Sequence, residues 1–253
     1  MKFWKYTSAG NDFVVFEEEF LAMKNLVPKL CDRRFGIGAD GVLVYKESIA
    51  HDFEMIYFNA DGGIAEMCGN GARALCHFAK SVKKKAKDHL VFGTSSGIYS
   101  AEFLTENTIK MLMSEVTRSN LSLEDLCPAG SGFYIVGVPH VVIDGLDFDK
   151  SFAQRVRNDI RFKNGSNVNF IKKLAENKFE VRTFERGVEA ETLACGTGIT
   201  AVGAFVMDRG LADSNVVEII ARGGEFKVEF QDGHYFLTGP TELIFSGEIR
   251  EKV

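Results

Sequence analysis

Cys68-Gly69-Asn70-Gly71-Ala72-Arg73-Ala74 is followed later in the chain by the related stretch Cys195-Gly196-Thr197-Gly198-Ile199-Thr200-Ala201. Both stretches read C-G-x-G-x-x-A, and each leads directly into an apolar segment with helical character. A polar residue, Asn59 or Glu185, closes a strand-like segment nine or ten residues before the cysteine. The repeat predicts two related halves, each with a cysteine at the N-terminus of a helix.

A cysteine in this position meets unpaired backbone N–H groups and the positive end of the helix dipole, which stabilise its thiolate. Two such cysteines predict an acid–base pair that works on opposite faces of one substrate, because a thiolate and a thiol can invert a carbon centre in either direction. The N–H groups around Gly69–Gly71 and Gly196–Gly198 can stabilise the anionic intermediate. This chemistry needs neither a metal nor an organic cofactor, and we expect none.

Most of the remaining chain is predicted to form short strands, because aromatic and β-branched residues alternate with turn signals. The predicted helices are Ala72–Val82, Gly198–Asp208 with Gly210 just past its end, Leu26–Asp32 and Lys150–Asn158. The predicted strands are Lys2–Tyr6, Phe13–Phe16, Val42–Tyr45, Phe53–Phe58, Leu90–Phe92, Ile98–Leu104, Thr108–Met113, Phe133–Val136, Val141–Ile143, Val168–Ile171, Phe179–Phe184, Val216–Ala221, Phe226–Phe230, Tyr235–Leu237 and Leu243–Phe245.

A second repeat supports the division into halves, since Ser8–Val15 and Val136–Val142 both lead from a turn of small residues into paired valines. We therefore predict an α+β fold of two pseudo-symmetric halves, each a mostly antiparallel sheet wrapped around a central helix. The expected halves are residues 1–115, completed by the C-terminal strand 241–253, and residues 116–240. The active site is expected in the cleft between them.

Composition narrows the class of protein. The 253 residues carry a net charge of −5, which argues against a nucleic-acid-binding surface. The N-terminus lacks the apolar segment of a signal peptide, and no apolar stretch is long enough to span a membrane. Five cysteines without a C-x-x-C motif or zinc-ligand spacing predict a cytoplasmic protein with reduced thiols.

The motifs together resemble those of the diaminopimelate epimerase family, whose members are cofactor-independent two-cysteine enzymes. The similar segments occur in the family's order from residue 8 to residue 198: Ser8–Phe13, Asp32–Asp40, Phe58–Gly62, Met67–Arg73, Asn167–Phe170, Glu185–Gly187 and Glu191–Gly198. The resemblance implies the family's two-half fold, a homodimer, and interconversion of LL- and meso-diaminopimelate for lysine or peptidoglycan synthesis.

The resemblance also implies roles for individual residues. Cys68 and Cys195 correspond to the two catalytic bases, and Gly69-Asn70 and Gly196-Thr197 to the groups that hold the reacting amino-acid centre. The residues that correspond to further substrate contacts, including contacts to the distal end of the substrate, are Asn11, Asn59, Asn167, Glu185 and Arg186. An arginine can pair with a carboxylate, and a glutamate can accept hydrogen bonds from an ammonium group.

Two positions depart from the family's pattern. Val138 precedes Pro139-His140 where many members carry a substrate-contacting asparagine, and Gly41 stands where some members have glutamine. These departures leave the specificity for the distal end of the substrate open. A related racemase or epimerase of proline, hydroxyproline or histidine therefore remains an alternative.

The repeated cysteines are also compatible with functions of a different class. A thiol-redox protein that cycles a Cys68–Cys195 disulfide, a non-catalytic amino-acid-binding module and a papain-like hydrolase are each consistent with the residues alone. Cys31, Cys76 and Cys127 lack a glycine-rich helix start and are expected to fill the core. We expect His140 to support the cleft wall or a cysteine, whereas Arg73 could be a solvated helix residue or a support for substrate carboxylates. His140 and Arg73 are not included among the predicted catalytic residues.

Overall fold

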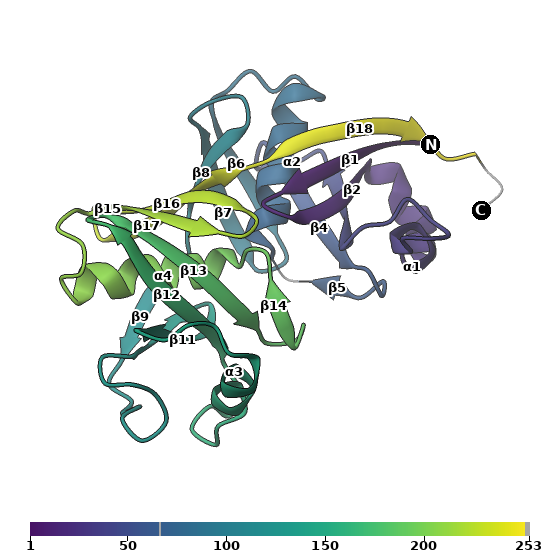
Figure 1. Cartoon of the computed structure of the whole chain (residues 1–253). Coiled ribbons are helices and arrows are strands. Elements are labelled where there is room, and N and C mark those ends of the chain that lie inside the picture. Colours follow the sequence, from purple (N-terminus) through teal and green to yellow (C-terminus); the bar gives the residue numbers. More distant parts are fainter. Residues whose placement is uncertain (66, 251–253) are drawn as a thin grey trace. The chain divides into compact units, whose positions relative to one another are not determined.

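The computed structural model describes residues 1–65 and 67–250. The chain divides into two compact units (Figure 1): unit 1 comprises Met1–Met111 with Gly239–Val253, and unit 2 comprises Leu112–Thr238. No helix within the described residues is long and apolar enough to cross a membrane.

Unit 1 is built on one mixed sheet whose strands pair in the order β18–β1–β2–β3–β4–β6–β7–β8, with the short β5 added beside β4. Among the described residues of this unit, the parallel pairs are β2–β3 and β4–β6. Its strands are β1 (Lys2–Ser8), β2 (Asn11–Glu17), β3 (Gly41–Lys46), β4 (Phe53–Asn59), β5 (Ile64–Ala65), β6 (His89–Thr94), β7 (Gly97–Phe103), β8 (Thr108–Leu112) and β18 (Glu242–Glu248).

Unit 2 repeats this pairing scheme in the order β9–β10–β11–β12–β13–β15–β16–β17, with the short β14 beside β13. Its parallel pairs within the described chain, β11–β12 and β13–β15, fall at the corresponding places. The strands are β9 (Val116–Ser119), β10 (Gly132–Val136), β11 (Val138–Asp144), β12 (Asn167–Ala175), β13 (Lys178–Glu185), β14 (Ala190–Thr192), β15 (Val216–Ala221), β16 (Gly224–Gln231) and β17 (His234–Pro240).

The parallel pairs explain where the helices lie, because parallel neighbours need a crossover connection. In unit 1 the 3-10 helix η1 (Glu18–Leu26) and α1 (Val27–Cys31) connect β2 to β3, and α2 (Gly69–Ser81) lies between β4 and β6. In unit 2 the matching crossovers are α3 (Lys150–Arg157) and α4 (Gly196–Asp208). The predicted α+β fold with two pseudo-symmetric halves is confirmed.

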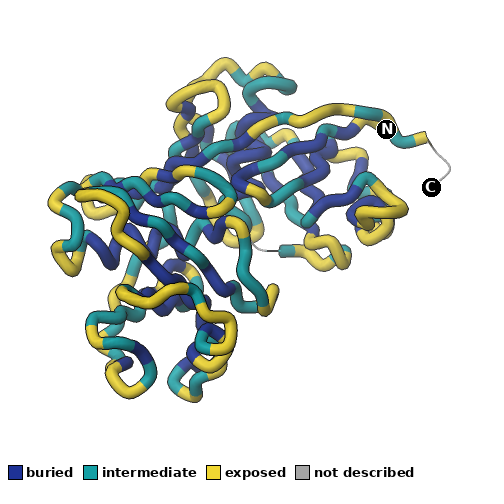
Figure 2. The backbone as a smooth tube through the Cα atoms, viewed as in Figure 1, coloured by how far each residue is buried: buried dark blue, intermediate teal, exposed yellow. Residues whose placement is uncertain are grey.

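Each sheet surrounds the second helix of its unit. The helix α2 contacts β18, β1, β2, β3 and β4, and its residues from Asn70 to Ala79 are buried. The helix α4 contacts β10 to β13, β15 and β16, and it is buried from Gly198 to Val206. Figure 2 shows the central strands and helices in dark blue and the connecting loops in yellow. These two helices therefore lie in the cores of their units.

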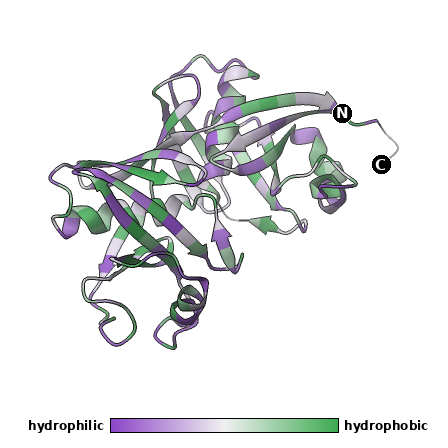
Figure 3. Ribbon diagram, viewed as in Figure 1, coloured by the Kyte–Doolittle hydropathy of each residue, from purple (hydrophilic) through white to green (hydrophobic). Residues whose placement is uncertain are grey.

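The strands beside the central helix are buried on both faces, because successive side chains point to opposite sides of a sheet. In β2, Phe13 and Val15 belong to the core around α2, whereas Val14 and Phe16 pack with η1 and α1. In unit 2, Val141 and Ile143 of β11 pack with residues of α3. The strands accordingly carry bands of both hydropathy colours, with the hydrophobic bands prominent (Figure 3).

The structure extends the sequence prediction in several places. Every predicted strand overlaps an observed one, but β5, β9, β14 and η1 were not predicted. The strands β5 and β14 are too short to show an alternating pattern, and β9 is largely polar. Both central helices begin at the glycine after the cysteine, earlier than their apolar pattern indicates. Gly210, with φ of +64°, takes the predicted place after α4.

Candidate active site

Cys68 and Cys195 occupy the N-cap positions of α2 and α4 with nearly the same backbone conformation. Their φ and ψ angles are −132° and 116° for Cys68, and −120° and 108° for Cys195. The Cys68 Sγ accepts a hydrogen bond from the Gly71 N–H at 3.5 Å, whereas the Cys195 Sγ lies 3.5 Å from the Thr197 Oγ1. The first turn of each helix leaves backbone N–H groups without intrahelical acceptors beside the thiol.

The glycines of the repeated motif allow the helix to start directly against the sheet. A Cβ at Gly71 would come within 3.0 Å of Leu43 Cδ2, and one at Gly198 would come within 2.4 Å of Asn169 Oδ1. At Gly69, apart from its chain neighbours and its own helix backbone, no described atom lies within 4 Å of the corresponding Cβ position. The second glycine is therefore needed for packing in both helices. Gly69 leaves room beside the exposed N–H groups, whereas a Cβ at Gly196 would lie 3.3 Å from Leu237 Cδ2.

Arg73 is completely buried in α2, so the solvated-helix interpretation of this residue is wrong. Its Nη2 donates a hydrogen bond to Asn70 Oδ1. Burial lowers the pKa of Arg73 to about 10, and attraction to the Cys68 thiolate opposes this shift. Because the guanidinium stays protonated at neutral pH, it favours the thiolate form of Cys68.

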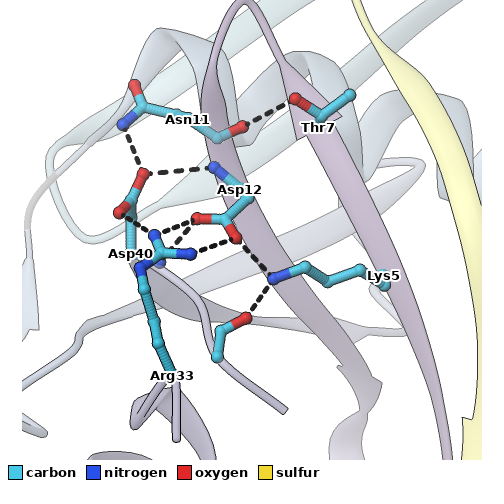
Figure 4. Close-up of polar contacts among 7 residues, drawn as sticks. Lys5, Thr7, Asn11, Asp12, Arg33 and Asp40 are labelled. Atoms are coloured by element: carbon cyan, nitrogen blue, oxygen red, sulfur yellow. Dashed lines mark hydrogen bonds and ion pairs between the residues drawn. The ribbon is translucent and has the colours of Figure 1, made fainter.

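Asn11 and Asn70 come together in unit 1. Asn11 begins β2, and its Oδ1 accepts a hydrogen bond from Asn70 Nδ2 in the first turn of α2. Asn11 Nδ2 donates to Asp40 Oδ2 at 3.0 Å (Figure 4). Asn59 ends β4 opposite Gly41, which in turn pairs with Phe13 of β2. Asn59 and Asn11 therefore lie at the same edge of the sheet.

The predicted substrate contacts of unit 2 occupy the corresponding edge. Asn167 begins β12, and its Oδ1 accepts a hydrogen bond from the Arg186 backbone N–H at 2.8 Å, while its Nδ2 donates to the Pro139 carbonyl at 3.1 Å. Glu185 is the last residue of β13 and is partly buried. Burial raises the pKa of the Glu185 carboxyl, and the neighbouring Thr192 hydroxyl opposes this shift.

His140 lies beneath the edge of unit 2 and is completely buried. Its Nδ1 is 3.3 Å from Asn169 Nδ2, and its Nε2 has no hydrogen-bond partner among the described residues. Burial, aided by repulsion from Arg186, lowers the pKa of His140 to about 3. The imidazole is therefore neutral at physiological pH, and it lies next to the asparagine on which the start of α4 packs.

The other cysteines differ clearly from Cys68 and Cys195. Cys31, Cys76 and Cys127 are all buried, as predicted for core residues. Burial raises the pKa of Cys31 and Cys127 to about 11 and that of Cys76 still further. These thiols are protonated at neutral pH and poorly suited to proton abstraction.

A cluster of charged side chains lies beside Asn11, and the sequence predicted no function for it. Asp12, Arg33 and Asp40 belong to the segments that carry the family resemblance, and Lys5 joins them in the structure (Figure 4). The four residues come from separate parts of unit 1, so the motifs of the family resemblance could have indicated Asp12, Arg33 and Asp40 but not Lys5. No group of three or more His, Cys, Asp or Glu side chains within the described residues is arranged to hold a metal ion.

Solved structures of other proteins share this fold. A phenazine biosynthesis protein of the PhzF family from Bacillus anthracis matches with a TM-score of 0.74 at 14% identity, covering 99% of both chains. A hydroxyproline epimerase from Agrobacterium vitis, solved with trans-4-hydroxy-L-proline, matches with a TM-score of 0.68 at 14% identity, over 98% of this chain and 90% of that one. At such low identity these matches establish the fold.

The family is established by closer sequence matches. The family model for diaminopimelate epimerase matches residues 3–119 and 133–244. Proteins named diaminopimelate epimerase from Flavobacterium psychrophilum and Aquifex aeolicus are 37% and 36% identical; the matches cover 98% and 100% of this chain and 100% and 99% of theirs. The chain therefore belongs to the diaminopimelate epimerase family, which confirms the resemblance predicted from its motifs.

Proposed function

We propose that this protein interconverts LL- and meso-diaminopimelate by moving a proton at one α-carbon, with Cys68 and Cys195 as the two acid–base groups. The observation that carries this proposal is the paired N-cap cysteines in a chain whose two halves both match the family model. The two cysteines have neighbouring N–H groups that favour a thiolate, unlike the three core thiols.

In the proposed reaction one cysteine starts as thiolate and the other as thiol. The thiolate takes the proton from the α-carbon, and the electron pair left behind spreads into the adjoining carboxylate. The thiol then gives its proton to the opposite face of the same carbon, so the centre is inverted and the two sulfurs exchange protonation states. The N–H groups at the starts of α2 and α4 stabilise the intermediate charge.

The proposed site lies in a cleft between the halves 1–115 and 116–240. Gly69-Asn70 and Gly196-Thr197 would hold the carboxylate and amine of the reacting centre. The other proposed contacts, which include those to the distal amino-acid end, are Asn11, Asn59, Asn167, Glu185 and Arg186. The proposal is supported by the positions of these five residues at the sheet edges from which the two cysteine helices start.

A second candidate is a two-cysteine epimerase of a smaller amino acid, such as proline, hydroxyproline or histidine. The observation that favours it is the pair of departures at Val138 and Gly41, which remove two amide side chains from the binding edges. Glu185 and Arg186 favour a substrate with a charged distal end, and so favour diaminopimelate. We further propose that the enzyme is a cytoplasmic homodimer that supplies lysine or cell-wall synthesis.

Proton NMR of LL-diaminopimelate in D₂O tests the function, with reduced enzyme and a chelator present. The expected result is loss of the α-proton signal with formation of the meso isomer. Exchange with L-proline, trans-4-hydroxy-L-proline or L-histidine in place of diaminopimelate would establish the second candidate. No exchange with any of the four substrates would reject both.

A further inference from the structure

A chain of directed hydrogen bonds runs through unit 1 from the buried Arg73 to the partly exposed Asp40. Arg73 donates to Asn70 Oδ1, Asn70 Nδ2 donates to Asn11 Oδ1, and Asn11 Nδ2 donates to Asp40 Oδ2. Asn70 stands directly beside Gly69 and the Cys68 cap at the start of α2. These hydrogen bonds therefore join the candidate active site to the charged cluster of Lys5, Asp12, Arg33 and Asp40.

The groups at the two ends fix the orientation of both amides. A guanidinium can only donate hydrogen bonds, and an ionised carboxylate can only accept them. Asn70 must therefore turn its oxygen toward Arg73, and Asn11 must turn its nitrogen toward Asp40. The opposite orientation of either amide would place two donors or two acceptors against each other. The Asn11–Asn70 contact satisfies both requirements.

Asp40 is itself held in place on several sides (Figure 4). It accepts hydrogen bonds from the Asp12 backbone N–H at 3.2 Å and from Arg33 Nη2 at 2.7 Å, and its own backbone N–H donates to Asp12 Oδ1 at 3.1 Å. Arg33 also binds Asp12 through two hydrogen bonds, and Lys5 Nζ reaches Asp12 at 2.6 Å. Asp40 is thus fixed by a network of charges that contains no candidate catalytic residue.

The hydrogen-bond chain uses one N–H of each amide. Asn11 and Asn70 each have a second N–H, and both side chains lie by the first turn of the Cys68 helix. Two further N–H donors beside a helix N-terminus suit an anionic group such as a carboxylate. With either amide reversed, an oxygen would face that carboxylate in place of a donor.

We propose that Asp40, clamped by Arg33 and Asp12, is a positioning residue that orients Asn11 and Asn70 as donors to a carboxylate of the substrate. This inference rests on the proposed function. The described part of unit 2 has no matching chain of hydrogen bonds, because Val138 and Thr197 occupy the positions that correspond to Asn11 and Asn70. The first half therefore binds its carboxylate through oriented amides, whereas the second half must use other groups.

The test is Asp40→Asn, which keeps the shape but turns an acceptor into a group that can also donate. We expect KM for LL-diaminopimelate to rise about tenfold, which is the effect of one hydrogen bond to a charged group. The kcat should change less than threefold, because Cys68 and Cys195 are untouched. The matched control is Asp52→Asn. Asp52 also accepts hydrogen bonds from a cation, Lys87 Nζ at 2.7 Å, and from a backbone N–H, that of Val91 at 2.8 Å. The KM of this control variant should stay within twofold of wild type.

Arg33→Gln provides a second route if Asp40→Asn does not fold. Arg33 is 59% exposed, so its removal loosens Asp40 with little effect on packing, and KM should rise about threefold at constant kcat. An unchanged KM in every one of Asp40→Asn and Arg33→Gln that folds would overturn the inference. A rise in the KM of Asp52→Asn equal to that of Asp40→Asn would overturn it as well. A wild-type enzyme that does not act on diaminopimelate would overturn the proposed function instead, so the two failures are distinguishable.

Discussion

The two units build the same backbone around their cysteines but distribute polarity in opposite ways. Register pairs Phe13 with Gly41 in unit 1 and His140 with Asn167 in unit 2, so these residues correspond. The strand residues below the start of α2 are mostly apolar, namely Phe13, Leu43 and Tyr57. The residues at the corresponding positions below α4 are polar, namely His140, Asn169 and Thr183.

Inside the helices the contrast is reversed. Arg73 places a buried charge near Cys68, whereas its counterpart Thr200 only returns a hydrogen bond to the Gly196 carbonyl at 2.9 Å. Duplicated geometry therefore does not mean equivalent chemistry. Unit 1 places a buried cation within its helix near the cysteine, and unit 2 supports its helix from a neutral hydrogen-bonded layer below.

Removing either thiol is the strongest test of the common geometry. We expect Cys68→Ala and Cys195→Ala each to lower kcat for epimerisation by at least about a thousandfold, because each reaction direction needs both an acid and a base. The measurement is the rate of meso product formation from LL-diaminopimelate. Cys31→Ala and Cys127→Ala serve as controls and should remain active; near-normal rates in either of the first two variants would reject the two-base reaction.

Arg186, the proposed contact to the distal end of the substrate, should give the next largest effect. Arg186→Ala is expected to raise KM for diaminopimelate about 10- to 100-fold, the range for loss of a charge-assisted hydrogen bond. Arg161→Ala is the control, because Arg161 forms ion pairs with Asp125 and Asp159 and is not among the predicted substrate contacts. Equal KM values for the two variants would contradict the assignment of Arg186.

The buried charge of unit 1 can be tested against its counterpart. Arg73→Met removes the cation beside Cys68, and we expect a higher pKa for that thiol and about tenfold slower alkylation by iodoacetamide at pH 7. The measurement is made in a Cys195→Ala background so that Cys68 is followed separately. Thr200→Val, tested in a Cys68→Ala background, should change alkylation of Cys195 less than threefold. Equal effects would mean that the two units do not differ in this way.

The polar layer under α4 should contribute to stability. Asn169 donates to the Val141 carbonyl at 3.1 Å and accepts from Thr183 Oγ1 at 3.0 Å, so Asn169→Leu leaves buried partners without hydrogen bonds. We expect a loss of about 1–3 kcal/mol in the free energy of unfolding, measured by urea denaturation. The reciprocal Leu43→Asn should also destabilise unit 1. A neutral or stabilising Asn169→Leu would show that the polar layer can be exchanged for an apolar one.

The last prediction concerns acid stability. Since the pKa of His140 is about 3 in the folded protein, below the ordinary value near 6.5, the unfolded chain binds an extra proton between these two pH values. Stability should therefore fall as the pH drops below about 6.5, with a contribution of at most about 1.4 kcal/mol per pH unit. His140→Phe, which copies Phe13, should reduce this slope in thermal melts at pH 4 to 7. An unchanged slope would mean that other groups cause the acid sensitivity.

The sequence was sufficient for the repeated cysteine helices, since a glycine-rich start and an apolar run are local signals. It also placed Gly210 after α4 and nearly all the strands. It could not decide the state of Arg73, because polar residues in a helix are solvated unless tertiary structure surrounds them. The network of Lys5, Asp12, Arg33 and Asp40 depends on contacts between distant segments, which periodicity and spacing do not show.

The first measurement is the position of deuterium early in the reaction of LL-diaminopimelate with wild-type enzyme in D₂O. If two cysteines act on opposite faces, the meso product carries deuterium at its inverted carbon from the first turnover, while the remaining LL substrate keeps its α-protons. A single base would have to serve both faces, so the hydrogen it returns would enter LL substrate and product alike and would in part be the original proton. Deuterium that enters unreacted LL substrate as fast as product, or a product that retains the original proton, would contradict the two-base account.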